Sequence, residues 1–247
     1  MANAARQRQT QTLLHIGGEM LMPLAEAALW WPARRTLIVS DLHLEKGSSF
    51  AARGQMLPPY DTASTLRVVE TLVETWHPET VISLGDSFHD PRAETRMDEA
   101  ARGRVRALTA ACDWIWVEGN HDPDPPQHLG GRAANLLHLG ALVFRHEPTG
   151  EVGEIAGHLH PVAKITTRHR ALRRKCFISD GQRLVMPSLG AFTGGLNVLD
   201  AAFDPLFEPG GRMVSMIGAD GVYPVSNTRL RGDGPGQETS RWRMNRA

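Results

Sequence analysis

The sequence predicts an α/β fold in which two packed β-sheets are flanked by helices. In the first half of the chain, apolar runs of strand length alternate with amphipathic helical patterns, which favours a largely parallel sheet. In the second half, short strand-like runs follow one another with turn residues between them, which favours hairpins and a second sheet. Polar side chains that bind metals stand directly after most of these runs.

The composition is that of an ordinary globular enzyme. The chain has 247 residues, with 27 Lys and Arg against 27 Asp and Glu. This balance predicts neither a nucleic-acid coat nor a membrane-surface binder, although a local basic groove is compatible with it. The two cysteines, Cys112 and Cys176, are far apart, which excludes a disulfide framework. Residues 1–11 are polar and no apolar run approaches the ~20 residues of a membrane span, so we expect a cytoplasmic protein that does not associate with membranes.

The first half of the chain reads as strands and helices in alternation. Residues 13–24 predict two short strands around Gly17 and Gly18, and residues 36–40 form a continuous apolar strand. Asp61 is a suitable N-cap for a helix that Pro78 would end. A strand at 81–84, a helix at about 95–111 and a strand at 114–117 follow. We expect a site at the carboxyl ends of these strands.

The second half is rich in short strands. They are predicted at 135–139, 141–145, 154–156, 162–167, 175–179 and 183–186. Residues 179–182 are typical of a turn. We therefore expect a polar tail over residues 1–12, a single catalytic domain over 13–228, and a disordered tail over 229–247, which is rich in Gly, Arg and polar residues.

Five short stretches carry potential metal ligands. They are Asp41-Leu42-His43, Gly85-Asp86-Ser87-Phe88-His89-Asp90, Gly119-Asn120-His121-Asp122, Arg145-His146-Glu147 and Gly157-His158-Leu159-His160. Asp41 and His43 alternate across one residue, so an extended segment would point both the same way. A carboxylate such as that of Asp86 can bridge two metals. Oxygen and imidazole donors without thiolates suit Mn, Fe or Zn, and we expect Mn.

Two cations roughly 3.5–4 Å apart would lower the pKa of a bridging water for in-line attack on a phosphate. In order and spacing, the five stretches resemble the signature of the calcineurin-like metallophosphoesterase superfamily, which is D-x-H, G-D, G-N-H-[DE], H and G-H-x-H. The resemblance implies a four-layer α-β-β-α sandwich of two mixed sheets. It implies that one metal binds Asp41, His43, Asp86 and His160, and that the other binds Asp86, Asn120, His146 and His158. His121 would contact the phosphate and assist the leaving group.

His89 and Asp90 follow the shared Asp86 at positions where several members of the superfamily place a residue that faces substrate. The resemblance thus makes His89 a second catalytic candidate and Asp90 a substrate-binding one. The alternative for His89 is a hydrogen bond that orients a ligand. Asp122 is expected to orient His121 or to hold the loop.

A narrower resemblance concerns residues 41–47, 85–90 and 190–196. These are similar to the ligase-associated DNA damage response endonucleases, a bacterial branch distantly related to SbcD-type nucleases. That likeness implies manganese-dependent cleavage of single-stranded or flexible DNA in DNA repair, in functional association with a DNA ligase and a helicase. Hydrolysis of a small substrate, such as a nucleotide or a cyclic phosphodiester, is the alternative activity. A non-catalytic scaffold of the same fold is the remaining one.

A basic segment between two predicted strands carries five cations, which are Arg168, Arg170, Arg173, Arg174 and Lys175. Placed near the site, they would bind DNA phosphates through Coulomb attraction and counterion release. The alternative is a solvated loop whose charges protect an edge strand from pairing. Trp114 and Trp116 would stack on bases if exposed, but their apolar strand favours burial.

Overall fold

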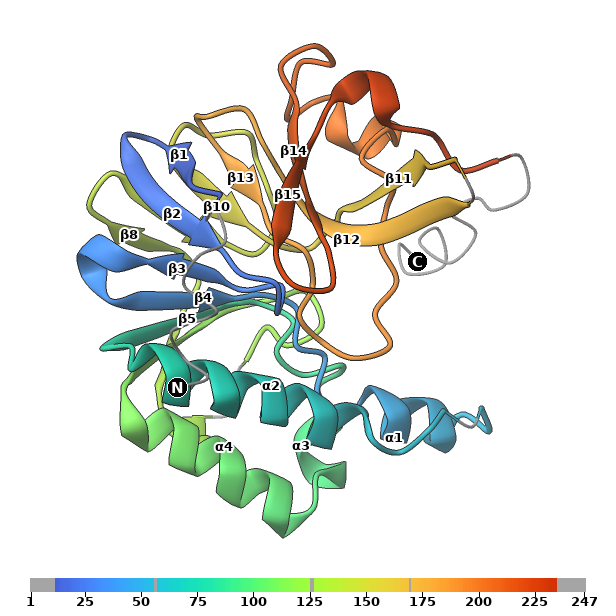
Figure 1. The fold of residues 1–247 in the computed structure, drawn as a ribbon. Helices are drawn as coiled ribbons and strands as arrows, with labels where there is room; N and C mark the ends of the chain where they lie inside the picture. The colour runs from blue at the N-terminus through green and yellow to red at the C-terminus, as the bar shows by residue number, and fades with distance from the viewer. Residues whose placement is uncertain (1–11, 56, 125–126, 169, 235–247) are drawn as a thin grey trace, which may run out of the picture.

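Two mixed β-sheets stacked against each other form the body of the protein (Figure 1). This computed structural model describes residues 12–55, 57–124, 127–168 and 170–234. The first sheet has seven strands in chain order, antiparallel from β1 to β4 and parallel from β4 to β7. They are β1 (Leu14–Ile16), β2 (Glu19–Pro23), β3 (Leu29–Trp31), β4 (Thr36–Val39), β5 (Thr80–Leu84), β6 (Asp113–Val117) and β7 (Arg132–Ala134).

The second sheet has eight strands in the order β15-β14-β12-β13-β10-β9-β8, with β11 paired to β12 beside this path. Strands β9, β10 and β13 are parallel to one another, as β4 to β7 are in the first sheet. The strands are β8 (Leu137–Leu139), β9 (Leu142–Arg145), β10 (Glu154–Ala156), β11 (Val162–Thr166), β12 (Ala171–Ser179), β13 (Leu184–Val185), β14 (Met213–Ile217) and β15 (Val222–Val225).

Helices cover the outer face of the first sheet, below the strands in Figure 1. They are α1 (Lys46–Ala52), α2 (Asp61–Trp76), α3 (Ala93–Arg96) and α4 (Glu99–Ala111). Short 3-10 turns join other elements: η2 (Pro32–Arg34), η3 (Gln127–Leu129), η4 (Ala201–Phe203) and η5 (Asn227–Arg229). The segment around η4 lies on the outer face of the second sheet, where Phe203 and Phe207 are buried against Val185 and Val214.

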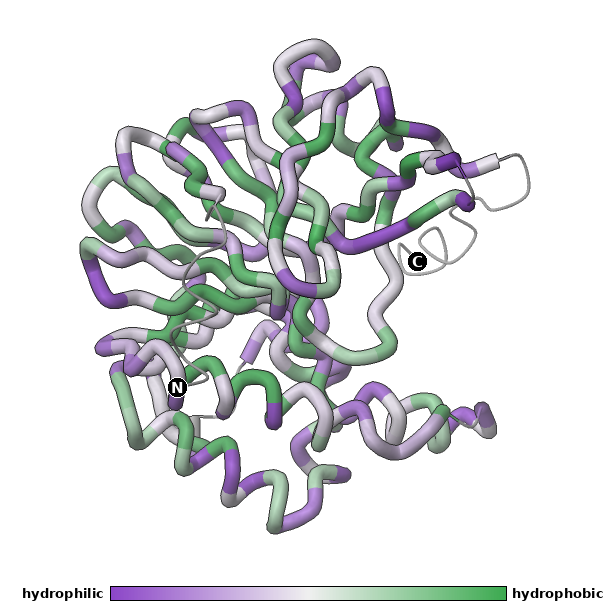
Figure 2. The backbone as a smooth tube through the Cα atoms, viewed as in Figure 1, coloured by the Kyte–Doolittle hydropathy of each residue, from purple (hydrophilic) through white to green (hydrophobic). Residues whose placement is uncertain are grey.

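Alternation along the central strands separates the apolar layers. Leu37 and Val39 of β4 pack towards the helices, whereas Ile38 between them faces the second sheet. In the same way, Trp114 and Trp116 of β6 lie under the helices, at 2% and 1% exposure, and are not free to stack on bases. Because both faces of these strands are covered, the strands read as continuous apolar runs. Figure 2 shows these interior strands as the hydrophobic part of the chain.

The predicted α/β class with two mixed sheets and flanking helices is confirmed. The helix expected near Asp61 is α2, which ends at Trp76 before Pro78 as predicted, but Asp61 is its first residue and the N-cap is Tyr60. The helix expected at 95–111 is divided into α3 and α4, because the Asp98 side chain accepts a hydrogen bond from the amide of Ala101 and starts a new helix. Strands β3, β7, β14 and β15 and helix α1 were not predicted.

The chain beyond residue 228 differs from the expected tail as far as it is described. Leu230 is buried and forms an isolated bridge with Ile165. The amide of Arg231 donates to the Lys164 carbonyl, and Asp233 pairs with Arg173. Residues 229–234 therefore pack against β11 and β12, because Leu230 supplies an apolar anchor among polar neighbours. Residues 235–247 of the expected tail lie outside the described residues, as do residues 1–11 of the N-terminal one.

Among the helices of the described ranges, none combines the length and apolar character needed to cross a membrane.

Candidate metal centre

The five ligand-bearing stretches meet because each follows a parallel strand. Asp41, Asp86 and Asn120 come after β4, β5 and β6 of the first sheet, and His146 and His158 come after β9 and β10 of the second. Carboxyl ends of parallel strands lie at one edge of a sheet. The two sheets place these edges side by side, so residues more than a hundred positions apart in the chain meet at one centre. For example, Nε2 of His160 lies 3.0 Å from Oδ1 of Asp41.

The ligand stretches are not extended as predicted. Asp41, His43, Asp86, His158 and His160 all have left-handed backbone conformations, with φ between 44° and 67°. In the first stretch, left-handed residues alternate with the buried Leu42 and Leu44. This alternation keeps Asp41 and His43 on one side, as expected, while the leucines enter the core.

One cluster contains Asp41, His43 and His160, all buried. Nε2 of His160 lies 3.0 Å from Oδ1 of Asp41 and 3.4 Å from Nε2 of His43. Nε2 of His43 is 3.8 Å from Oδ2 of Asp86. Ligand atoms about 2.1 Å from one cation lie roughly 3–3.4 Å apart, so these spacings suit a shared ion.

A second cluster is centred on Nε2 of His146. This atom lies 2.9 Å from Oδ1 of Asn120, 3.1 Å from Nδ1 of His158 and 3.4 Å from Oδ1 of Asp86. The other ring nitrogen, Nδ1, is 3.0 Å from the Leu84 carbonyl oxygen, to which it donates. In a neutral ring, Nε2 then carries a lone pair that faces other acceptors. A cation at their centre satisfies all of them.

The titration of these groups agrees with a demand for positive charge. Burial opposes ionisation of Asp41 and Asp86, but His160 beside Asp41 and His146 beside Asp86 outweigh it and lower both pKa values. Burial also opposes a charge on His146, yet the carboxylates of Asp86 and Asp41 raise its pKa to about 9. Burial and a neighbouring imidazole lower the pKa of His43 and His158, which are then neutral, as metal ligation requires. The donor set therefore fits two divalent cations.

Asp86 lies between the two clusters. Its Oδ1 faces His146 and accepts a hydrogen bond from the amide of His121, while its Oδ2 lies 3.8 Å from both His43 and His121. The carboxylate thus offers one oxygen to each side. The structure brings the other six predicted ligands together around it, and the individual roles of all seven as ligands stay predictions.

His121 and His89 form a pair of rings on the more exposed flank of the centre. Their centroids are 5.4 Å apart with an interplanar angle of 16°, and each also contacts His43. The side chain of His121 is 25% exposed, against 4% for His43 and His146. Phe50 of α1 packs on His89. Burial, together with the positive charge of Lys46, lowers the pKa of His89 to about 4. His121 is therefore accessible to a substrate, and His89 supports its ring from behind.

Buried contacts hold the loops that carry the ligands. Oδ2 of Asp122 accepts hydrogen bonds from the amides of Ser87 and Phe88, directly after Asp86, which agrees with the expected loop-holding role. Ser40, which the sequence did not single out, donates to Oδ2 of Asp41 at 2.5 Å. A side chain at Gly119 would come within 2.2 Å of the Asp86 amide nitrogen, so only glycine fits there.

Asp90 does not face the metal clusters through any of its described contacts. Its carboxylate binds Arg96 at 2.7 Å and accepts from the amide of Arg92. Arg96 also donates to Ser48 of α1. These contacts tie α3 to α1 beside His89, and the contact of Asp90 with substrate stays a prediction.

The five predicted DNA-binding cations divide into two groups. Arg168, Arg170 and Arg174 are exposed on the β11–β12 hairpin, whose polar character Figure 2 shows. Lys175 is instead mostly buried, and its Nζ donates to the carbonyls of Ser188, Leu189 and Gly190. Arg173 donates to the Gly195 carbonyl and pairs with Asp233. The segment predicted to lie between strands is largely the first half of β12.

The comparisons agree with this geometry. The model of the calcineurin-like phosphoesterase family matches residues 34–195. The chain therefore belongs to this family and is a metal-dependent phosphoesterase. The structure is similar to that of the nuclease MPE of Pseudomonas putida, with 29% identity and a TM-score of 0.68 over 87% of this chain and 100% of that one.

A phosphoesterase of E. coli, Yfce, is 16% identical over 77% of this chain and 97% of its own, with a TM-score of 0.39. No curated protein matches the chain.

Replacing Asp86 by Ala should remove the carboxylate that both clusters share. Bound metal, measured by mass spectrometry of the purified protein, should fall from two ions per chain to one or none. Because bound metals stabilise the transition state by several kcal/mol, hydrolysis of a generic phosphodiester should slow by at least about 10³-fold. Asp113→Ala, at an exposed ion pair with Arg132, is the matched control. Near-normal turnover in Asp86→Ala would refute the shared-carboxylate assignment.

His121→Ala should keep both metals, because the residue is placed beside the ligands and not among them. The rate of phosphodiester hydrolysis should fall by roughly 10²–10⁴, the usual scale for a positioned acid–base group. The control is His128→Ala, which removes an exposed partner of Glu94. Loss of metal from His121→Ala would show that this residue is itself a ligand.

Proposed function

We propose that this phosphoesterase is a manganese-dependent endonuclease that cleaves single-stranded or flexible DNA in DNA repair. The observation that carries the proposal is the pair of clusters around Asp86, with the accessible His121 beside it. The similarity to the Pseudomonas putida nuclease, which extends over the whole of that chain, supports a nucleic-acid substrate. Nitrogen and oxygen donors without thiolates support Mn over metals that prefer soft thiolate ligands.

The roles of the side chains follow from their positions. When bound, two cations would polarise the phosphate and lower the pKa of a water between them. Asp86, held by the His121 amide, fixes the spacing of the two clusters. Nε2 of His121 lies 3.8 Å from the Asp86 carboxylate and the side chain is partly exposed, so the ring is positioned to contact a phosphate oxygen and to give a proton to the leaving oxygen.

The burial of the clusters favours a flexible strand. Asp41 is fully buried, and His43 and His160 are almost fully buried. A DNA strand must therefore bend towards these residues for one of its phosphates to reach a cation. A duplex is stiff over about 150 base pairs, and bending a short site costs several kcal/mol. A single strand meets no such cost. The exposed Arg168, Arg170 and Arg174 would attract either form.

Circular single-stranded DNA tests the proposal, because a circle has no ends for an exonuclease. Incubation with Mn²⁺ should convert the circle to linear fragments on a denaturing gel, and a relaxed duplex circle should react more slowly. Asp86→Ala, prepared in parallel, should leave the single-stranded circle intact.

Equal conversion by the wild type and Asp86→Ala would indicate a contaminating nuclease. If the wild type leaves the circle intact but hydrolyses a generic phosphodiester, the substrate is a small molecule and the endonuclease assignment is wrong.

The exposed arginines of the β11–β12 hairpin should contribute to DNA binding. In the His121→Ala background, which limits cleavage, changing Arg168, Arg170 and Arg174 together to Ala should weaken binding of a single strand. The slope of log affinity against log salt should flatten by about 0.7 for each lost phosphate contact. The measurement is a salt titration by fluorescence anisotropy.

A triple variant of Arg35, Arg106 and Arg132, which are exposed and ion-paired elsewhere, is the charge-matched control. Unchanged affinity in the hairpin variant would leave the solvated-loop interpretation of that segment.

A further inference from the structure

A tightly held segment follows β13 and bonds to two of the stretches that carry the predicted ligands. We call residues 188–196 the 192 loop. At its start, the amides of Leu189 and Gly190 donate to the carbonyls of Ser40 and Asp41, at 2.8 and 3.1 Å. At its end, the Leu196 amide donates to the Leu159 carbonyl. The loop therefore joins the backbone of the two stretches that carry Asp41 and His160.

Further contacts fix the loop from its other sides. The Ala191 amide donates to Thr65 of α2, and the Thr193 hydroxyl bonds both Ser188 and the Gly190 carbonyl. A side chain at Gly195 would come within 2.2 Å of the His160 carbonyl oxygen, so the loop lies directly on the ligand stretch. The loop is thus anchored on α2 as well as on the metal centre.

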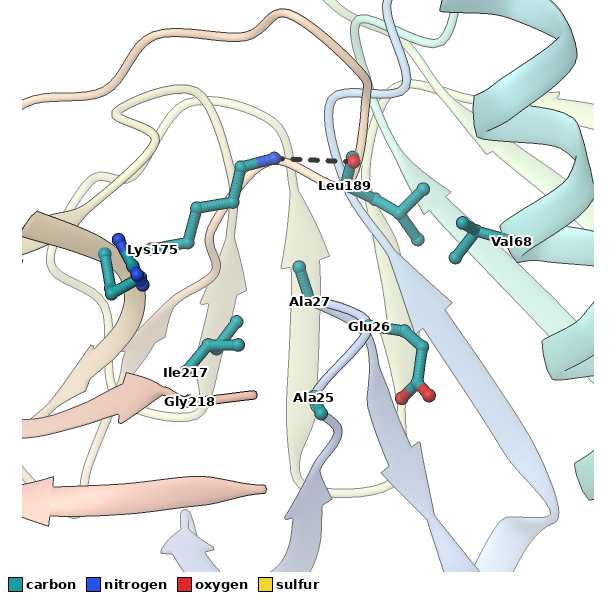
Figure 3. A pocket seen from close by; sticks show the side chains of 9 residues that line it. Ala25, Glu26, Ala27, Val68, Lys175, Leu189, Ile217 and Gly218 are labelled. Carbon is teal, nitrogen blue, oxygen red and sulfur yellow. Dashed lines mark hydrogen bonds between the residues drawn. The ribbon is translucent and has the colours of Figure 1, made fainter. Parts of the chain in front are cut away.

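The basic strand β12 clamps the same loop. Lys175 donates to three successive carbonyls, those of Ser188, Leu189 and Gly190, and Figure 3 shows its amine reaching Leu189. Arg173 donates to the Gly195 carbonyl at 2.8 Å and stays 41% exposed. Hydrogen bonds from a charged donor are stronger than those between neutral groups. The loop is therefore rigid at both ends and carries a positive charge on one side.

Phe192 stands at the tip of this loop with its side chain 51% exposed. Its φ is 55°, and among the exposed large apolar residues of the described ranges it alone has a positive φ. A bulky residue in this conformation is a rare outlier with a strained backbone. Single exposed apolar side chains are common and need no explanation. An exposed aromatic residue with a strained backbone, in a loop bonded to the stretch that carries Asp41, does need an explanation.

We infer that Phe192 is a stacking platform for an unpaired nucleobase next to the cleaved phosphate, an inference that rests on the proposed nuclease function. The Cα atoms of Phe192 and Gly190 are at most about 7 Å apart, and Gly190 bonds Asp41. The ring thus lies within reach of a nucleotide bound at the metals. Base–aromatic stacking tolerates any sequence, and in a duplex the faces of the bases are already stacked. Phe192 therefore selects single-stranded substrates.

The test compares the wild type with Phe192→Ala, Phe192→Leu and Phe192→Trp on a single-stranded oligonucleotide with Mn²⁺. Stacking of one base corresponds to a factor of roughly 5 to 150, so kcat/KM should fall by that order in the Ala and Leu variants. The Trp variant should cleave at least as well as the wild type. A second series replaces one nucleotide at a time by an abasic unit.

With the abasic unit at one particular position, kcat/KM of the wild type should fall by the same factor as it does in Phe192→Ala. The abasic unit at that position should then lower kcat/KM of Phe192→Ala almost no further. A purely structural role of Phe192 would not produce this non-additivity. Tyr223→Ala, an exposed aromatic change on β15, should match the wild type on every substrate. Cleavage of an oligonucleotide made only of abasic units, which has no aromatic ring to stack, should lose far less than cleavage of ordinary DNA in Phe192→Ala.

Equal losses on the fully abasic oligonucleotide and on ordinary DNA in Phe192→Ala, or additive losses in the abasic series, would overturn the inference and leave the ring a structural part of the loop. DNA cleavage that is unchanged in Phe192→Ala would overturn the inference alone. A wild type that hydrolyses a generic small phosphodiester but no DNA would overturn the proposed function, and the inference with it.

Discussion

The arrangement around Asp86 depends on the attraction between a bound cation and a group of buried acceptors. Asp41 and Asp86 are almost fully buried, and such burial is costly for a carboxylate unless positive charge compensates for it. Without metal, the compensation falls on His146, whose pKa rises to about 9 despite its burial. Divalent cations would provide the charge without a proton. Metal binding and local folding are therefore coupled at this edge of the two sheets.

The strain in the ligand stretches is a consequence of the same constraint. Left-handed conformations at Asp41, His43, Asp86, His158 and His160 each cost about 1 kcal/mol or more. Asp and His adopt this conformation more readily than most residues. Contacts between stretches maintain it: the His43 amide donates to the Asp86 carbonyl, and the His158 amide donates to the Asp41 carboxylate. Each stretch is thus stabilised by another, and the centre forms as one unit.

Much of this arrangement could be predicted from the sequence, because the strands before Asp41, Asp86 and Asn120 are continuous apolar runs and parallel strands bring their carboxyl ends together. Local pattern could not predict which backbone conformation the ligands adopt. Helix α1 was missed because Gly47, Ser48 and Ser49 are weak helix formers. The start of α1 is held by Asp61, whose carboxylate accepts a hydrogen bond from the Gly47 amide instead of capping α2. Strand β14 forms by pairing with β12, which lies far away in the sequence, and β15 forms by pairing with β14.

The basic segment shows why charge alone is a poor guide to substrate contacts. Arg174 and Lys175 are neighbours, yet a strand turns successive side chains to opposite faces. Arg174 is exposed, whereas Lys175 is directed into the loop carbonyls, where burial lowers its pKa to about 8. Removing Lys175 would disturb the 192 loop and, through it, the stretches that carry Asp41 and His160. A loss of DNA cleavage in such a variant would not by itself identify a phosphate contact, because in this fold the basic strand also supports the metal centre.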